Sequence, residues 1–127
     1  NQPRLRLHRD GAERFNFYYN GNFYRAGTTT SDRDLKENIQ LITGSSIDKV
    51  IKLTPKSFNY IGDTTFHAGF IAQEVKEVWP SLVNGTDGNK DMGVDYEGIV
   101  AHLCNCVKEL KAENDSLKAR VTAIEGS

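Results

Sequence analysis

The chain has 127 residues, of which 38% are hydrophobic and 26% charged, and its formal net charge is −1. This composition is typical of one small globular module and argues against a disordered chain. The 16 basic and 17 acidic residues give no electrostatic reason to expect nucleic acid or an anionic membrane, and no apolar run reaches the roughly 18 residues that span a bilayer. We therefore expect a protein partner, with no nucleic acid and no membrane. The chain opens at Asn1 without a signal-like segment, so we expect a piece of a longer protein.

Residues 1–30 alternate apolar and polar side chains in the manner of β-strands. The apolar members of this pattern are Leu5, Leu7, Phe15, Phe17, Tyr19 and Phe23. Asp10-Gly11 and Asn20-Gly21 separate the runs, and Asn20-Gly21 supplies the two positive-φ positions of a type I′ hairpin turn. The pattern predicts a short β meander. So small a sheet cannot bury its aromatic side chains alone, so it needs sister chains or an upstream body beside it.

Residues 31–95 mix helical and strand patterns, which predicts an α+β domain. A helix is expected over 47–53, with Ser45 or Ser46 at its N-terminus and Pro55 beyond its end. The other expected elements are two strands, one helix that ends at the Trp79-Pro80 step, and a polar loop: 56–61, 66–70, 72–78 and 84–90.

The C-terminal segment carries a heptad repeat of apolar side chains. Positions a and d are held by Val100, Leu103, Val107, Leu110, Asn114, Leu117, Val121 and Ile124. Glu113 with Lys118, and Arg120 with Glu125, form g-to-e′ pairs of opposite sign, which is typical of parallel helices in register. The repeat predicts a parallel coiled coil over 97–125. The alternative is a single amphipathic helix packed on its own domain.

Cys104 and Cys106 lie two residues apart on the predicted helix, so their side chains point in different directions and cannot form a disulfide within one chain. This usage indicates a reducing compartment. We expect both to act as partly buried small hydrophobes, with metal binding or an interchain disulfide as the alternative. The nearby His102 does not complete a zinc ligand set, so no metal site is predicted.

Ser31 to Ile39 reads Ser-Asp-Arg-Asp-Leu-Lys-Glu-Asn-Ile and follows three consecutive threonines, Thr28 to Thr30. Together with Gly69-Phe70-Ile71-Ala72-Gln73-Glu74-Val75, Val94-Asp95-Tyr96 and the heptads, this stretch resembles the intramolecular chaperone auto-processing domain at the C-termini of phage tailspikes, tail fibres and endosialidases. The resemblance covers residue 31 to about residue 124. It implies a homotrimer in which 31–127 is the chaperone domain and 1–30 is the C-terminal end of a β-structured fibre.

The resemblance also implies that the chain cuts itself between Thr30 and Ser31, with Ser31 as nucleophile and Lys36 as base. The Ser31 hydroxyl can reach the Thr30 carbonyl through a five-membered ring, which makes acyl transfer intramolecular; direct hydrolysis aided by the same residues is the alternative. Arg33 is too basic to accept a proton, and a lysine amine must be desolvated or crowded by cations before it can. Residues five apart do not share a helical face, so the segment is expected to be extended or turned.

Five residues are supporting candidates in this reading, and each has an ordinary structural explanation as well. Asn38 would donate to the developing oxyanion and Asp32 would orient Arg33 or a neighbouring chain, although both also suit turns or the surface. His67 lies just before the 69–75 block, where the family is expected to place a polar residue near the cleavage site; a histidine that only satisfies backbone groups is the alternative. Gln73 and Glu74 open a predicted helix, where a carboxylate favours the dipole.

The fold expected overall is α+β, with a short N-terminal β meander, a mixed α/β chaperone domain and a C-terminal parallel coiled coil. The heptads alone, with Asn114 at position a, favour a parallel dimer, whereas the family assembles as trimers; we follow the family. The resemblance implies assembly in the bacterial host cytoplasm without a cofactor, after which 1–30 stays in the virion fibre and 31–127 is released or left bound. The alternatives are a trimerisation clamp that never cuts and a receptor-binding tip, with aromatic side chains between Phe15 and Tyr24 facing sugar rings.

Overall fold

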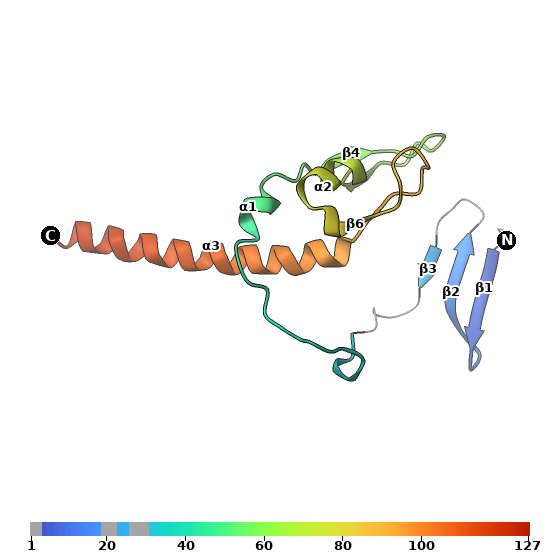
Figure 1. The fold of residues 1–127 in the computed structure, drawn as a ribbon, viewed down its shortest axis with the longest axis horizontal. Helices are drawn as coiled ribbons and strands as arrows, with labels where there is room; N and C mark the ends of the chain where they lie inside the picture. The colour runs from blue at the N-terminus through green and yellow to red at the C-terminus, as the bar shows by residue number, and fades with distance from the viewer. Residues whose placement is uncertain (1–3, 19–22, 26–30) are drawn as a thin grey trace. The chain divides into compact units, whose positions relative to one another are not determined.

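The structure is a computed structural model that describes residues 4–18, 23–25 and 31–127. The chain divides into two compact units, residues 1–40 and residues 41–127 (Figure 1). Short strands, short helices and one long C-terminal helix make the fold α+β, as predicted.

The first unit holds a three-stranded antiparallel sheet in the order β1-β2-β3, formed by Arg4–Arg9, Ala12–Tyr18 and Phe23–Arg25. This is the predicted meander. Asp10 and Gly11 join β1 to β2 with φ angles of 54° and 76°, between the paired residues Arg9 and Ala12. A two-residue loop with two positive φ angles is a type I′ turn. The same turn was predicted at Asn20-Gly21, which lies outside the described residues.

One face of β1 and β2 carries a row of apolar side chains. Leu5 is paired with Phe17 and Leu7 with Phe15 across the two strands. All four side chains are exposed, with Phe15 the least so at 37%. Cross-strand apolar pairs stabilise a sheet, but a sheet this small gains little from a face that stays in water.

The second unit is built around a small apolar core. Val75, Trp79, Leu82 and Ile99 are buried, and half-buried aliphatic and aromatic side chains surround them. The elements of this unit are α1 (Ile47–Val50), β4 (Lys56–Phe58), β5 (His67–Gly69), α2 (Ala72–Val78), the 3-10 turn η2 (Pro80–Leu82), β6 (Val83–Asn84), β7 (Gly93–Val94) and α3 (Tyr96–Glu125). β4 pairs with β5 and β6 with β7, both antiparallel.

The helix α2 has the predicted bounds, because proline disfavours helical backbone at the residue before it and Trp79 leaves the helix with φ −147°. The strands are shorter than predicted. After Phe58 the Asn59 amide turns back and donates to the Asp63 carbonyl at 2.6 Å. Gly62, with φ 87°, completes this turn. These hydrogen bonds from a side chain to the local backbone end the pairing of β4 with β5 earlier than the alternation of apolar and polar residues predicts.

The helix α1 is about one turn shorter than predicted. It ends at Val50, whereas the prediction placed its end at residue 53. Ser46 is its N-cap residue, as expected, but its side chain does not cap the helix. Instead the Ile47 N–H donates to Glu109 Oε2 on α3 at 3.1 Å. An orphan N–H at a helix start needs a partner, and here a distant helix supplies it.

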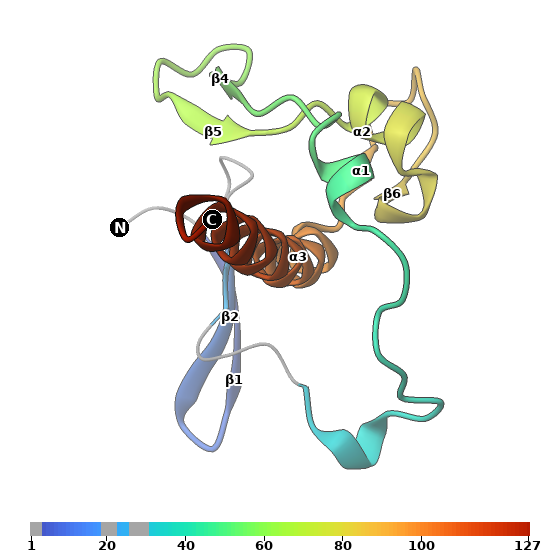
Figure 2. The same cartoon turned by 90° about the vertical axis from the view of Figure 1, so that its left-hand side faces the viewer.

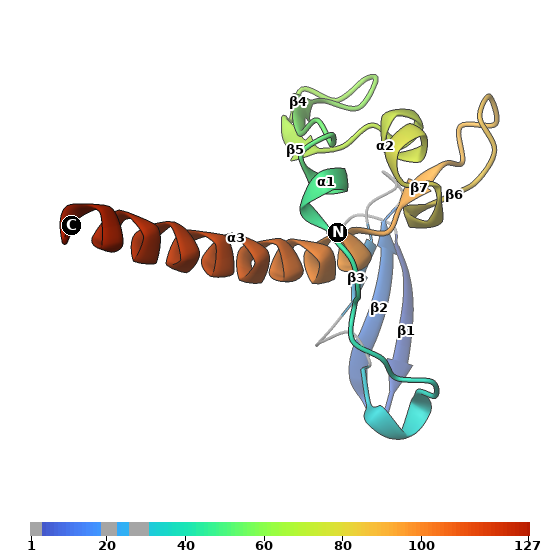
Figure 3. The same ribbon diagram turned by 60° about the vertical axis from the view of Figure 1, so that its left-hand side comes forward.

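The helix α3 was predicted over 97–125 and runs from Tyr96 to Glu125. Asp95 caps it by accepting a hydrogen bond from the Gly98 N–H at 2.9 Å. Viewed along α3 in Figure 2, the helices α1 and α2 and the strand β6 all lie to one side of it. Figure 3 shows that they gather at its N-terminal half, while its C-terminal half projects beyond them. Every residue from Leu110 to Ser127 is exposed.

Candidate functional site

A tight turn over residues 31–36 brings Ser31 and Lys36 into contact. The 3-10 turn η1, Arg33–Leu35, lies between them, and the Asp32 carboxylate caps it by accepting from the Asp34 N–H at 3.0 Å. Lys36 leaves the turn with extended backbone, φ −124° and ψ 146°. Its Nζ then donates to Ser31 Oγ at 2.5 Å. Five residues apart in sequence, the two side chains meet because one turn reverses the chain between them.

In this contact the lysine nitrogen is the donor and the serine oxygen the acceptor, which is the reverse of the transfer that cleavage needs. A lysine ammonium has three donors and no acceptor, so Lys36 donates and the Ser31 oxygen accepts. To act as a base, the amine must first lose a proton and then take the hydroxyl proton of Ser31 along the same line. Both side chains are exposed to solvent. Water, which stabilises the ammonium, would have to leave before this reversal.

The remaining candidates in residues 31–40 occupy turn positions. The carboxylate of Asp32 is engaged by the backbone that it caps. Asn38 has φ 54°, a left-handed conformation that asparagine tolerates better than most residues. Thr30, on the other side of the expected cleavage bond, lies outside the described residues.

His67, Gln73 and Glu74 belong to residues 41–127, and each meets a different neighbour. The His67 ring on β5 lies against Phe58 and Tyr60, with ring centroids 6.1 and 5.4 Å away. The Gln73 amide donates to Asp87 Oδ1 at 2.9 Å. Glu74 Oε1 forms a salt bridge with Lys56, and its buried Oε2 has no hydrogen-bond partner among the described residues. The structure therefore does not gather these three side chains into one cluster.

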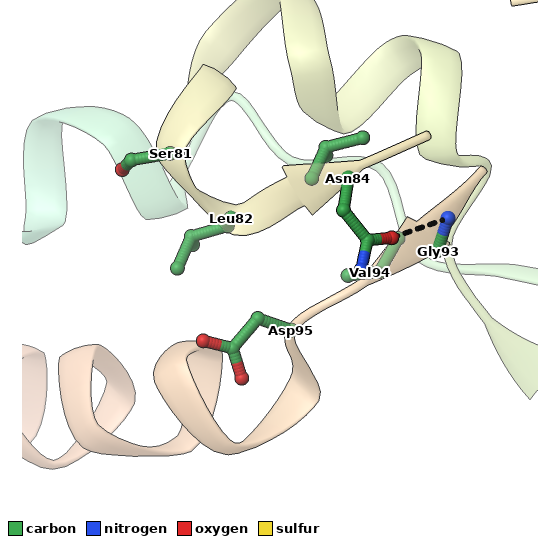
Figure 4. A pocket seen from close by; sticks show the side chains of 7 residues that line it. Ser81, Leu82, Asn84, Gly93, Val94 and Asp95 are labelled. Atoms are coloured by element: carbon green, nitrogen blue, oxygen red, sulfur yellow. Dashed lines mark hydrogen bonds between the residues drawn. The ribbon is translucent and has the colours of Figure 1, made fainter. Parts of the chain in front are cut away.

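Two hollows in the second unit were not anticipated from sequence. One, of about 490 Å³, lies between β4, the start of α2 and β7, and Phe58, Tyr60, Phe70, Met92 and Tyr96 are among its lining residues. The other, of about 460 Å³, is bounded by η2, β6, β7 and the start of α3 (Figure 4). There Asn84 Oδ1 accepts from the Gly93 N–H at 3.1 Å, and Asp95 already caps α3. The polar groups of Asn84 and Asp95 in this second hollow are therefore engaged in holding the backbone.

The predicted coil positions form an exposed row along α3. Their exposed fractions run from 43% at Leu103 to 72% at Ile124, and Asn114 is also exposed. The face that packs on the rest of the unit is a different one and carries the buried Ile99 and Cys106. The alternative in which a single helix buries its heptad row against its own domain is therefore not the arrangement found.

A polar cluster between α1 and α3 was also missed by the sequence analysis. It consists of Ser46, His102, Asn105 and Glu109, and we call it the α1–α3 clasp. Ser46 Oγ lies 3.0 Å from His102 Nδ1 and accepts from the Asn105 amide at 2.9 Å. The one available signal was the helical spacing of the three α3 residues, which places them on one face. That spacing alone does not indicate which segment they contact.

Both cysteines are free thiols. Cys106 is buried, as expected, but the expectation was wrong for Cys104, which is exposed because it lies two residues away on α3 and points in another direction. Burial, with the nearby Glu109 carboxylate second, raises the pKa of the Cys106 thiol above its ordinary 9.0. In the described part of the chain, no cluster of three or more His, Cys, Asp or Glu side chains is placed to hold a metal ion. Among the described helices, none combines the length and apolarity needed to cross a membrane.

Comparison with known proteins places the Ser31–Lys36 turn at the start of a family match. Residues 31–84 match the family model Peptidase_S74, described as chaperone of endosialidase. The matched segment runs from η1 through β6 and supports an intramolecular chaperone domain of phage tail proteins. No curated protein matches the chain.

Proposed function

We propose, from the membership of residues 31–84 in the chaperone-of-endosialidase family, that this chain is a C-terminal intramolecular chaperone that aligns three fibre or tailspike chains and then cuts itself off between Thr30 and Ser31. The family supports the chaperone role, and its peptidase name points to self-cleavage. The single observation that carries the cleavage proposal is the contact between Lys36 Nζ and Ser31 Oγ.

The proposed reaction moves one acyl group and consumes one water. The Lys36 amine takes the hydroxyl proton of Ser31, and Ser31 Oγ attacks the Thr30 carbonyl carbon. The bond from that carbon to the Ser31 nitrogen breaks, and the nitrogen leaves as an amine with the proton. Water then hydrolyses the ester between Thr30 and the Ser31 oxygen. The products are a carboxylate at Thr30 and a free amine and hydroxyl at Ser31.

Assembly through α3 is the second half of the proposal. The exposed heptad row of α3 offers apolar side chains at every a and d position except Asn114. Burying one Leu or Val side chain contributes roughly 1.5–3 kcal/mol, so a row of this length can offset the cost of association. Asn114 at position a would penalise shifted registers. Three parallel helices would hold three chain ends together in one register.

Assembly would also switch on the cut. In the single chain Lys36 is exposed and its ammonium is hydrated. If a neighbouring subunit covers the Ser31–Lys36 turn, water leaves, the neutral amine becomes more accessible and proton transfer from the hydroxyl can proceed. Cleavage would then follow assembly, and the loss of the clamp would leave a fibre whose persistence is kinetic.

The test is intact-mass analysis of the 127-residue chain after assembly and denaturation. We expect two fragments, 1–30 and 31–127, and an uncut chain in Ser31→Ala and in Lys36→Ala. Ser45→Ala and Lys52→Ala are matched controls, since both residues are exposed and belong to the same matched segment. Cutting in either site variant at the control rate would remove that residue from the mechanism.

A trimerisation clamp that never cuts is the second candidate. The observation that favours it is that the heptad row of α3 is complete without any contribution from Ser31 or Lys36. Trimers that carry Ser31 and Lys36 but remain uncut would support this clamp and contradict the cleavage proposal.

A further inference from the structure

We infer that, when the chains assemble, residues 41–95 of each chain cover one edge of the neighbouring chain's α3. We call residues 41–95, which precede α3 in the second unit, the head. The occupant of this surface is a second copy of the same chain, and the covered edge is the row of heptad e positions around Cys104. This inference rests on the proposed function, because it requires assembly through α3, and it adds a second contact between the chains.

The helix α3 packs on its own head along a sharply bounded face. From residue 98 to residue 109, every residue at heptad positions c, f and g is buried or half-buried, and every residue at a, b, d and e is exposed. The view along α3 in Figure 2 likewise shows α1, α2 and β6 to one side of it. The head therefore lies at the g edge of the heptad row and leaves the e edge open. The covered residues are Gly98, Ile99, His102, Asn105, Cys106 and Glu109.

A parallel bundle brings these two edges together. In a parallel coiled coil, a residue at g faces the e residue of the neighbouring helix in the next heptad. This spacing pairs Ile99 with Cys104 of the neighbouring chain. Ile99 is only 2% exposed, because it belongs to the apolar core of its own unit. Cys104 of the neighbouring chain therefore meets the head, and not a bare helix edge.

The residue types at the g and e positions change where the head ends. Beyond residue 110, where all of α3 is exposed, both g-to-e′ pairs join opposite charges. Beside the head, the pair of Ile99 with Cys104 carries no formal charge. A small apolar side chain can be covered without a partner, whereas a charged one cannot. In the e row of α3, all of which the structure describes, every residue except Cys104 is charged: Glu97, Lys111, Lys118 and Glu125.

The head also reaches the heptad row itself at the start of α3. Tyr96 occupies the d position one heptad before Leu103. Its hydroxyl accepts a hydrogen bond from the Phe70 N–H at 3.1 Å, and the two ring centroids are 6.0 Å apart. Tyr96 nevertheless remains 46% exposed. A neighbouring helix that packs on the heptad row would cover this aromatic border, which is favourable for apolar surface.

The position of the head on one edge also selects the orientation of the helices. In an antiparallel pair the g edges face each other, so two heads would compete for the same side. In a parallel bundle each head meets an open e edge, so every chain can be covered by the next one around the ring. The head thus disfavours antiparallel pairing in the half of α3 where no charged g-to-e′ pair does so.

The experiment measures how far assembly protects the e edge from iodoacetamide. The modification rate of Cys104 is compared between assembled chains and a monomeric variant, Leu110→Asp, whose substitution lies on the heptad row away from the labelled positions. Lys118→Cys is the matched control, because it occupies the same edge beyond the head. We expect assembly to slow the modification of Cys104 at least roughly tenfold and that of Lys118→Cys by no more than about threefold.

Peptide mapping assigns each modification, and analytical ultracentrifugation confirms the oligomer in every sample. If Lys118→Cys does not assemble, Glu125→Cys at the next e position takes its place. Equal protection at the two positions in assembled chains would overturn the inference and leave the proposed function intact, because the bundle would then form without the head. Wild-type chains that stay monomeric would overturn both.

Discussion

Lys36 Nζ donates to Ser31 Oγ at 2.5 Å, although five residues separate them and neither belongs to the 3-10 turn between them. The contact depends on the backbone on either side of that turn, with Asp32 capping its start and Lys36 extended at its end. The pair is thus held by local structure. Its chemistry depends on which partner holds the proton, and this gives the first prediction.

Replacing Lys36 with arginine should stop the cut while preserving the contact. The guanidinium keeps a positive charge and donors for Ser31 Oγ, but it does not lose a proton in proteins. A general base typically contributes a factor of 10²–10⁴, so we expect the rate to fall by at least about a hundredfold in assembled chains. Time-resolved mass analysis measures it, with Lys52→Arg as control. Cutting at the wild-type rate would show that Lys36 serves only as a donor.

Removing the Asp32 cap should slow the cut without abolishing it. In Asp32→Ala the Asp34 N–H loses its acceptor, so the turn that brings Ser31 to Lys36 is less populated. We expect a rate roughly fivefold lower, and a smaller loss in Asp32→Asn, whose side-chain oxygen still caps. Equal rates in the two variants would mean that charge at this position, and not capping, is what matters.

An acidic residue in the heptad row should prevent assembly. Leu117, at position d, is 46% exposed in the single chain. We expect Leu117→Asp to be monomeric at micromolar concentration by analytical ultracentrifugation and to remain uncut. Ala119→Asp, two residues further on at position f, should assemble normally. If the row is ordinary surface, the two variants will behave alike, because surface substitutions usually change stability by less than about 0.5 kcal/mol.

Two glycines in the 85–92 loop should respond differently to the same substitution. Gly85 and Gly88 have nearly equal φ angles, 87° and 91°. A Cβ at Gly85 would lie 2.6 Å from the Asp91 carbonyl oxygen, whereas one at Gly88 would meet nothing within 4 Å. Gly88→Ala should lower the free energy of unfolding by about 1–2 kcal/mol through backbone strain. Gly85→Ala should cost roughly 1–3 kcal/mol more in urea unfolding; equal losses would mean that the loop yields freely.

The two cysteines should differ in reactivity and in their dependence on pH. Burial raises the pKa of the Cys106 thiol above its ordinary value and shields the sulfur from reagents, whereas the Cys104 side chain is exposed in the single chain. We expect iodoacetamide to modify Cys106 at least roughly tenfold more slowly at pH 8. Peptide mapping distinguishes the two, with Cys104→Ser and Cys106→Ser as references. Faster modification of Cys106 would contradict its burial.

The raised pKa of Cys106 also determines how the free energy of unfolding changes with pH. A thiol whose pKa is higher in the folded than in the unfolded state contributes stability that is fully present below the unfolded value. That contribution is lost as the pH rises above about 9.0. The difference in unfolding free energy between wild type and Cys106→Ser should therefore shrink between pH 8 and pH 10. A difference that grows over this range would reverse the sign.

Local signals in the sequence predicted the elements that depend on few neighbours. Alternation predicted the meander, the Trp79-Pro80 step predicted the end of α2, and apolar periodicity predicted α3. The Ser31–Lys36 segment was expected to be extended or turned, and it is turned. The capping of α1 by Glu109 was not predictable, because the donor and the acceptor are 62 residues apart. Ser46 was expected to cap a helix, but its hydroxyl is engaged by α3 instead.

The long helix α3 also implies an order of folding within one chain, in which its N-terminal half forms before its C-terminal half. Residues Tyr96 to Glu109 of α3 are fixed by the core and by the α1–α3 clasp, whereas everything from Leu110 onward is exposed. Nucleating a helix is its costly step, and the docked half has already paid that cost. The exposed half can then extend one residue at a time from a helical segment whose orientation is already set. Each chain would therefore offer its partners a heptad row whose rotation was set by its own domain before they met.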